Sequence, residues 1–184
     1  RTVGVVGIAV ALAAAAVAPA GAEPAAEPLY DLIDAAAQRL QTADPVAASK
    51  WLSGGPVTDP ARVAQVLAAV SADAESANVP GDFVARVFTD QINATEAIQY
   101  SRFSWWKLDP AAAPGSAPDL SSSRALIDGL NQRMVGEIAG QWPVLRSPDC
   151  PARLGAAKTA VTADRALDQL YVTALDAATR SYCG

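Results

Sequence analysis

Several cationic side chains of this sequence stand at positions where a helix by itself would not favour them. Arg39 and Lys50 are eleven residues apart, so on one continuous helix they would share nearly the same face, with their backbones roughly 16 Å apart. Arg62 follows an Asp-Pro pair that predicts a helix start, and Arg124 also lies near an expected helix start, where the helix dipole disfavours positive charge. If these cations converge on one pocket, they would bind a small anion.

A second pair of polar residues has helical spacing. Thr95 and Gln99 are four residues apart and therefore stack on one face of a helix. Spacing alone leaves ordinary explanations open for all of these residues. Lone arginines are usually solvated, with their stems over apolar neighbours. Asp59 and Arg62 could form a local ion pair, and Thr95 and Gln99 could lie on the surface.

The composition narrows the chemistry that such a site could perform. The chain contains no histidine and two cysteines, which excludes imidazole-based triads and relays as well as Cys-rich metal centres. Carboxylates, amides, hydroxyls and cations remain, so the reaction uses these groups or needs no proton transfer. The net charge of −5 and the absence of a Lys/Arg run argue against nucleic-acid binding. We expect neither a metal ion nor a cofactor.

The elements that must position these residues are predicted to be helices of a single domain. Hydrophobic residues, rich in Ala and Leu, make up 51% of the 184 residues, and no strand pattern or internal repeat occurs. Apolar spacing and Pro or Gly breaks predict helical stretches at 30–51, with a restart or kink at Asp44-Pro45, and at 59–77, 82–107, 119–142 and 151–182. Residues 109–118 are expected to form an irregular loop. The sequence thus predicts an all-α bundle of about five or six helices.

Residues 1–22 are predicted to be a secretory signal peptide. Arg1 precedes a long apolar run, and Ala20-Gly21-Ala22 has the pattern of an A-x-A cleavage site. A transmembrane anchor is the alternative, because roughly 20 apolar residues can span a bilayer. On the signal-peptide interpretation, 23–184 is the mature domain, secreted or periplasmic and free of the membrane.

Cys150 and Cys183 are expected to form a disulfide, because an even pair in an exported chain is usually oxidised. The bond would close a loop of about 34 residues and fasten the C-terminal helical stretch at both ends. Two free buried thiols are the alternative.

Five stretches of the chain together resemble the secreted, all-helical class of chorismate mutase, of the AroQ type and gamma subclass. They are DAAAQRLQTADPVAASKW (34–51), DPARVAQVLA (59–68), FVARVFTDQINATEAIQYSRFSWWKLDP (83–110), DLSSSRALIDGLNQRM (119–134) and the tail from Cys150 to Cys183. The block ending in ATEAIQYSRF and the order of the basic residues are specific, and the resemblance covers nearly all of 30–183.

The resemblance implies that the protein rearranges chorismate to prephenate as a homodimer with a complete site in each chain. It also implies roles for the candidate residues: Arg39, Arg62 and Arg124 for the substrate carboxylates, Lys50 for the ether oxygen and a carboxylate, Gln99 as second donor to the ether oxygen, Asp59 near the substrate hydroxyl, and Thr95 as a further substrate contact. A protein without histidine suits this reaction, which needs no nucleophile and no obligatory proton transfer.

Two positions depart from some members of the class. At 99 some relatives have Glu, which donates a hydrogen bond only when protonated, whereas Gln99 donates at any pH. We therefore expect a flat pH–rate profile through neutrality. Val66 lies one turn beyond Arg62, where Gln is expected in closely similar enzymes, and its apolar side chain is expected to weaken substrate binding without abolishing the chemistry.

Two non-enzymatic interpretations compete with this one. The same bundle could be a secreted, non-catalytic binding module for a small dicarboxylate, although such a module has no need of donors to an ether oxygen. Alternatively, the four tryptophans could anchor a secreted interaction protein. Trp105 and Trp106 are adjacent at an expected helix end, so they cannot both face the core.

Overall fold

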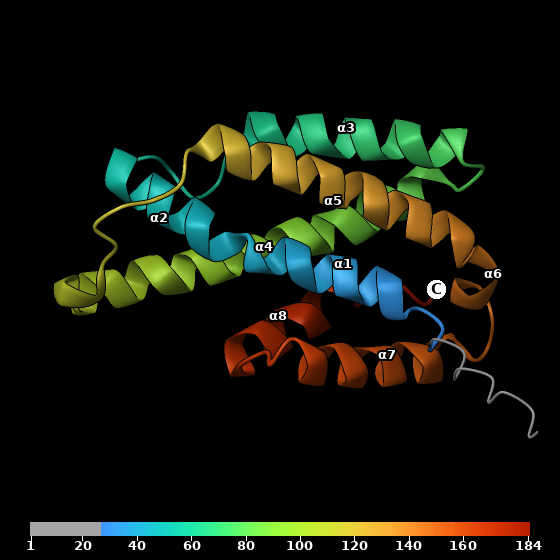
Figure 1. The fold of residues 1–184 in the computed structure, drawn as a ribbon. Helices are drawn as coiled ribbons and strands as arrows, with labels where there is room; N and C mark the ends of the chain where they lie inside the picture. The colour runs from blue at the N-terminus through green and yellow to red at the C-terminus, as the bar shows by residue number, and fades with distance from the viewer. Residues whose placement is uncertain (1–26) are drawn as a thin grey trace, which may run out of the picture.

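The computed structural model describes residues 27–184, and in this range it is entirely helical apart from its connections. The elements are α1 (Tyr30–Gln41), α2 (Ala43–Ser53), α3 (Pro60–Ser76), α4 (Gly81–Leu108), the 3-10 helix η1 (Pro110–Ala112), α5 (Leu120–Gly140), α6 (Trp142–Leu145), α7 (Cys150–Asp164) and α8 (Gln169–Ala178) (Figure 1). The predicted all-α bundle is confirmed, with more and shorter helices than expected. The predicted signal peptide and its cleavage site lie outside the described residues.

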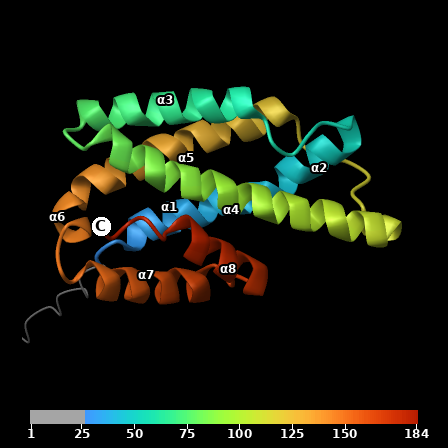
Figure 2. The same ribbon diagram turned by 180° about the vertical axis from the view of Figure 1, so that it is seen from behind.

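The helices form three layers around α4. Helices α3 and α5 lie along one side, α7 and α8 along the other, and α1, α2 and α4 lie between them (Figures 1 and 2). The long α4 packs against α1, α2, α3 and α8. Fully buried side chains from four helices fill the centre: Leu32, Ile33 and Leu40 of α1, Phe88 and Ile98 of α4, Met134 and Ile138 of α5, and Leu175 of α8. Within residues 27–184 no helix combines the length and apolarity needed to cross a membrane.

The break between α1 and α2 differs from the expected one. The helix restarts two residues before the expected Asp44-Pro45 position, so Asp44 is not the cap that an Asp-Pro pair would supply; the cap position is Thr42, whose hydroxyl donates to the Arg39 carbonyl at 2.7 Å. Asp44 lies in the first turn of α2 and instead accepts from Arg102 Nε of α4 at 2.7 Å. Pro45 is tolerated there because a helix's first-turn N–H groups have no intrahelical partner. As a result, Arg39 and Lys50 lie on separate helices rather than on one.

Two other segments also differ from their expected form. The stretch predicted as one helix over 151–182 is divided into α7 and α8, because Ala166 adopts a left-handed φ of 48° and the Asp168 carboxylate caps α8 by accepting from the Tyr171 backbone N–H at 3.0 Å. The loop expected over 109–118 contains the short 3-10 helix η1, which begins at Pro110. Neither short turn has a hydrophobic periodicity that would reveal it in the sequence.

The aromatic residues at the end of α4 pack as their adjacency requires. Trp106 is buried against α2, 5.5 Å from the ring of Trp51, whereas the neighbouring Trp105 is 54% exposed. Phe103 completes this small cluster with an edge-to-face contact to Trp51 at 5.2 Å. The prediction that Trp105 and Trp106 cannot both face the core is confirmed.

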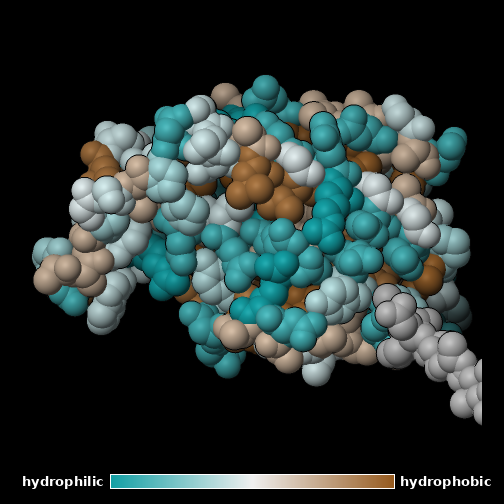
Figure 3. Space-filling model, viewed as in Figure 1, coloured by the Kyte–Doolittle hydropathy of each residue, from teal (hydrophilic) through white to brown (hydrophobic). Residues whose placement is uncertain are grey.

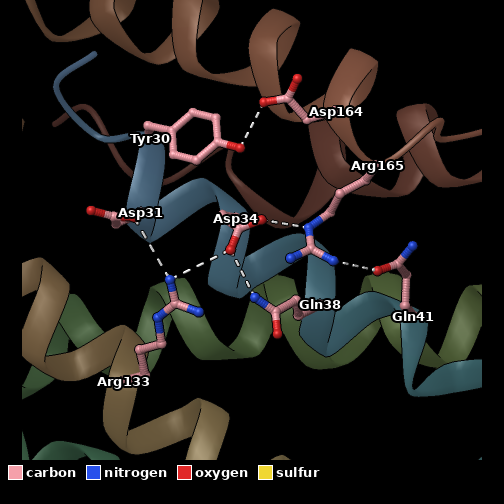
Figure 4. Close-up of polar contacts among 8 residues, drawn as sticks. All are labelled: Tyr30, Asp31, Asp34, Gln38, Gln41, Arg133, Asp164 and Arg165. Carbon is pink, nitrogen blue, oxygen red and sulfur yellow. Dashed lines mark hydrogen bonds and ion pairs between the residues drawn. The ribbon is translucent and has the colours of Figure 1, made fainter. Parts of the chain in front are cut away.

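Polar contacts on one surface fasten α1 to α5 and α7 (Figure 4). Asp34 of α1 accepts from the Nε of Arg165, the residue that follows α7, at 2.5 Å. Asp34 also pairs with Arg133 of α5 at 3.4 Å. Partial burial disfavours the charged form of Asp34, but the hydrogen bonds from Arg165 and Gln38 outweigh it, so the pKa of this carboxyl is lowered. A hydrophilic band crosses the middle of this face, over α1 (Figure 3). These contacts set the position of α1, which carries the first candidate site residue.

The predicted disulfide is confirmed. Cys150, the first residue of α7, is bonded to Cys183, which follows α8, with their Cα atoms 5.7 Å apart. The described residues contain no free cysteine, so the alternative of two thiols is excluded. The bond encloses both terminal helices rather than a single one.

Replacing both cysteines by alanine is expected to lower the free energy of unfolding by about 3–4 kcal/mol, because the reduced chain regains the entropy that the closed loop removes from the unfolded state. Urea unfolding of Cys150→Ala/Cys183→Ala beside the oxidised wild type measures the difference. Wild-type protein with a thiol reductant serves as the control and is expected to lose a similar amount. A loss below about 1 kcal/mol would contradict the loop-entropy account.

Candidate active site

A half-open cavity lies among α1, α2, α3, α4 and α5. Its empty volume, part of which is open to solvent, is about 650 Å³, within the range of small-molecule sites. All eight residues selected from the sequence line this cavity: Arg39, Lys50, Asp59, Arg62, Val66, Thr95, Gln99 and Arg124. Apolar side chains complete its walls: Val46, Val57, Val63, Ile92, Leu120 and Ile127. The bundle therefore brings together residues that are up to 85 positions apart in the sequence.

Arg39 is the buried cation of the cavity. It comes from the last turn of α1 and is 4% exposed. Its Nε donates to Asn131 Oδ1 at 2.7 Å and its Nη1 to Thr95 Oγ1 at 3.3 Å, both neutral acceptors. Among residues 27–184 its guanidinium has no carboxylate within ion-pair distance. Burial lowers the pKa of Arg39 to about 10, so the group is still charged at neutral pH; the more distant Asp128 favours this charge and Arg62 opposes it.

Lys50 is the second cation without a carboxylate in direct contact. It lies in the last turn of α2, where the helix dipole favours positive charge. Its Nζ donates to the carbonyl oxygen of Val57, in the connection between α2 and α3. Half-burial lowers the pKa of Lys50, a shift that the nearby carboxylates of Glu96 and Asp59 oppose and the cation of Arg124 reinforces. One of its three donors is used within the protein, which leaves two for a ligand.

The two remaining arginines are paired with carboxylates. Arg62 Nη2 contacts Asp128 Oδ1 of α5 at 2.5 Å, and its Nη1 donates to Gln65 at 2.9 Å. Arg124 Nη2 lies 3.5 Å from Asp59 Oδ2. These pairs are partly exposed, so their net contribution to stability is small and a ligand can replace the protein carboxylate at little cost.

Asp59 has two structural contacts in addition to its place on the cavity wall. As the cap of α3 it accepts from the Arg62 backbone N–H at 3.1 Å, directly before Pro60, as the Asp-Pro pair predicts. The suggested local ion pair between Asp59 and the Arg62 side chain does not form, because that guanidinium pairs with Asp128.

The residues that line the cavity carry more positive than negative charge. Its wall contains four cations and two carboxylates, Asp59 and Glu96, an excess of two positive charges.

Thr95 and Gln99 face the cavity from one side of α4. Both are buried, so the alternative of ordinary surface positions does not apply. Thr95 Oγ1 donates to the Gln91 carbonyl at 2.8 Å and accepts from Arg39. Gln99 is 4% exposed, and within the described residues its Oε1 has no hydrogen-bond partner. A buried amide oxygen without a partner is costly, and a donor group on a ligand, such as a hydroxyl, would complete its bonding.

Val66 lies on the wall between this cavity and a neighbouring one. It is buried and lines both the main cavity and a second space of about 440 Å³ between α3 and α5. Its side chain offers only an apolar contact, as expected from the sequence.

Three residues of the site escaped the sequence-based selection. Glu96 lines the cavity and accepts from Thr58 Oγ1 at 3.0 Å. Asp128 and Asn131 line the neighbouring space between α3 and α5 and hold Arg62 and Arg39. The available signal was helical spacing: Asp128 and Asn131 follow the cation at 124 by four and seven residues, on one helix face.

The arrangement is suited to holding a small dianion and stabilising negative charge that develops within it. Two cations without a carboxylate in direct contact, together with a buried amide, point to electrostatic chemistry rather than to nucleophilic attack. Among residues 27–184 no cluster of three or more carboxylates, cysteines or histidines is placed to hold a metal ion.

Sequence comparison finds relatives over most of the chain. The family described as chorismate mutase type II matches residues 30–100. The secreted chorismate mutase of Mycolicibacterium smegmatis is 54% identical over 176 residues, which are 96% of this chain and 97% of that protein. The secreted chorismate mutase of Mycobacterium tuberculosis is 50% identical over 178 residues, 97% of this chain and 89% of that protein.

Solved structures share the fold. A chorismate mutase from Burkholderia phymatum superposes with a TM-score of 0.81 at 31% identity, over 86% of this chain and 97% of that one. One from Burkholderia thailandensis gives 0.80 at 33% identity, over 85% and 99%. The secreted chorismate mutase of Yersinia pestis gives 0.68 at 25% identity, over 83% and 94%.

Proposed function

The chain belongs to the chorismate mutase type II family and is a chorismate mutase, an isomerase, and from this premise we propose how its cationic cavity rearranges chorismate to prephenate. The observation that carries the proposal is the meeting of Arg39, Lys50 and Gln99 in one cavity, where neither cation has a carboxylate in direct contact and the Gln99 amide can present its N–H groups to a ligand. Chorismate is a flexible dianion that carries two carboxylates and an ether oxygen.

Binding selects the reactive shape of the substrate. The rearrangement requires the pseudo-diaxial conformer, in which the two carbons that will be joined approach each other. Arg39 clamps one carboxylate in the interior, where its charge has no protein counter-ion. Arg62 and Arg124 bind carboxylate groups nearer the mouth by exchanging Asp128 and Asp59 for the substrate. Asp59, once released from that pair, accepts from the substrate hydroxyl.

Catalysis then comes from donors placed at the ether oxygen. In the single pericyclic step the C–O bond breaks ahead of C–C bond formation, so negative charge grows on that oxygen in the transition state. Lys50 Nζ and Gln99 Nε2 donate to it, and because both are already positioned their interaction strengthens as the charge develops. Thr95 supports this by holding the Nη1 edge of Arg39 and by lining the substrate pocket. No proton has to be transferred.

The similarity to secreted relatives also bears on where the enzyme works. We propose that the chain is exported, like the relatives that are named secreted chorismate mutases, and the Cys150–Cys183 disulfide supports this because such bonds persist in oxidising compartments. One chain supplies every predicted site residue, which supports the expectation of a complete site per chain. Assembly into a homodimer stays a prediction.

Lys50→Ala and Arg39→Ala are each expected to raise the barrier by about 3–5 kcal/mol, a loss of roughly 10²- to 10⁴-fold in turnover, because each removes charge that stabilises the transition state. A spectrophotometric assay of chorismate loss with detection of prephenate measures this. Lys107→Ala and Arg86→Ala, at exposed positions on α4, are the matched controls and should retain full activity. Wild-type turnover by either cavity variant would refute the assigned roles. Chorismate binding by the wild type without prephenate formation would instead indicate a dicarboxylate-binding module.

The pH profile is expected to be flat through neutrality and to fall on the alkaline side. Gln99 donates without titrating, and Lys50 must keep its proton, so kcat/KM declines as the pH rises through a Lys50 pKa that lies below the ordinary lysine value. Gln99→Glu should convert the profile into one that rises on acidification, because the carboxyl donates only when protonated. A wild-type rate that itself climbed steeply toward acid would contradict this assignment.

Val66→Gln is expected to lower KM for chorismate by roughly 2- to 10-fold with little change in kcat, because the new amide adds one polar contact to the cavity wall. Steady-state kinetics on chorismate measure the change, and urea unfolding checks that the polar side chain is accommodated. Val66→Leu, which adds volume without an amide, is the control and should not tighten binding. If the Gln variant binds chorismate no more tightly than the wild type, the expectation that the apolar side chain of Val66 weakens substrate binding is wrong.

A further inference from the structure

One face of α5 supplies or holds three of the four cations of the cavity. Arg124, Asp128 and Asn131 are spaced by four and three residues, so they share a side of this helix. Arg124 itself lines the cavity, Asp128 pairs with Arg62, and Asn131 accepts from Arg39. Helix α5 lies against both α1 and α3, which carry Arg39 and Arg62 (Figure 1).

The two acceptors on this face differ in charge and in burial. Asp128 is an exposed carboxylate, and its partner Arg62 reaches it at the edge of the cavity. Asn131 is 5% exposed, and its Oδ1 accepts from the buried Arg39 Nε at 2.7 Å. The partly exposed Arg62 is thus held by a charged acceptor, the Asp128 carboxylate, whose interaction is screened by solvent. The buried Arg39 is held by a neutral acceptor, the Asn131 amide.

An amide at this place has a specific electrostatic consequence. A hydrogen bond to Nε fixes the plane of the Arg39 guanidinium, while Thr95 orients one of its terminal nitrogens. A carboxylate in the same position would fix the same plane but would also neutralise the cation, and in a buried site that neutralisation is barely screened. The amide therefore positions Arg39 and leaves its charge for an incoming anion.

We propose that Asn131 is a positioning residue for the reaction, which orients Arg39 through a neutral acceptor so that the full positive charge acts on the substrate carboxylate. The proposal rests on the proposed function of the cavity. Asn and Asp have nearly the same shape, so replacing one by the other at the buried position 131 changes the charge next to Arg39 and little else.

Asn131→Asp tests the charge and Asn131→Ala tests the orientation. The Asp variant keeps the acceptor for Arg39 Nε, so we expect its free energy of unfolding to be unchanged or raised while kcat/KM falls roughly 10-fold or more, mostly through KM, because the new carboxylate competes with the substrate. The Ala variant is expected to lose roughly 10- to 100-fold, mostly in kcat, because Arg39 is no longer held in place. A residue with a purely structural role would not lose activity while stability is kept.

Gln132→Glu is the matched control, since it adds the same charge to the neighbouring, exposed position of α5 and does not contact Arg39. It should stay within about twofold of the wild type. Asn131→Asp kinetics within the same twofold would overturn the proposal, and so would a Gln132→Glu variant impaired as strongly as Asn131→Asp.

A measurement on the unaltered protein separates this proposal from the proposed function. The Arg39 Nε–H signal in nitrogen NMR should be protected from exchange with water, because it is buried and bonded to Asn131. Rapid exchange would overturn the positioning role even if the enzyme converts chorismate, and this measurement also decides the case if the variants fail to fold. If the wild type does not convert chorismate, the proposed function fails while a protected signal still supports the contact.

Discussion

The structure depends on a positive charge that it buries without a counter-ion. Desolvating the Arg39 guanidinium is expensive, and among the described residues no carboxylate lies within ion-pair distance to offset that cost directly. The surrounding helices keep the group charged by surrounding it with neutral oxygen atoms from α4 and α5 and with the face of Phe88, whose ring centre is 5.8 Å from its Cζ. The uncompensated charge is what makes the cavity attractive to an anion, in a protein whose net charge is −5.

The remaining cations are arranged around this one according to how much solvent they see. Arg62 and Arg124 are partly exposed and pair with Asp128 and Asp59. Each pair offsets the charge of its arginine while the cavity is empty, and a ligand carboxylate can replace the protein carboxylate. Lys50 is intermediate, since it is half-buried and held by a backbone carbonyl instead of a carboxylate. The cavity thus has a fixed, preorganised interior and an exchangeable rim, as expected for an enzyme that works by electrostatic complementarity to a transition state.

The rest of the fold maintains the relative positions of the helices that carry these groups. The break at Thr42 allows Lys50 to approach Arg39 from a separate helix, and the Asp44–Arg102 pair fastens the second helix to α4. On the opposite side, the contacts of Asp34 with α5 and with Arg165 hold α1 in register with Asn131 (Figure 4). The disulfide closes α7 and α8 beneath this assembly, where they cover α1 and α4.

The sequence by itself determined the helical class, the Asp59 cap and the cysteine pair, and, through its resemblance to a known family, it predicted the eight candidate residues that line the cavity. These features are local or depend on residue identity, so periodicity and motif are sufficient to find them. Only the tertiary structure decided that Arg39 is held by Asn131, that Arg62 pairs with Asp128 and that Asp44 binds Arg102 instead of capping a helix. The physical reason is that helical periodicity specifies which residues share a face of one helix, whereas the partners of a face lie 58 to 92 residues away and are chosen by how the helices pack.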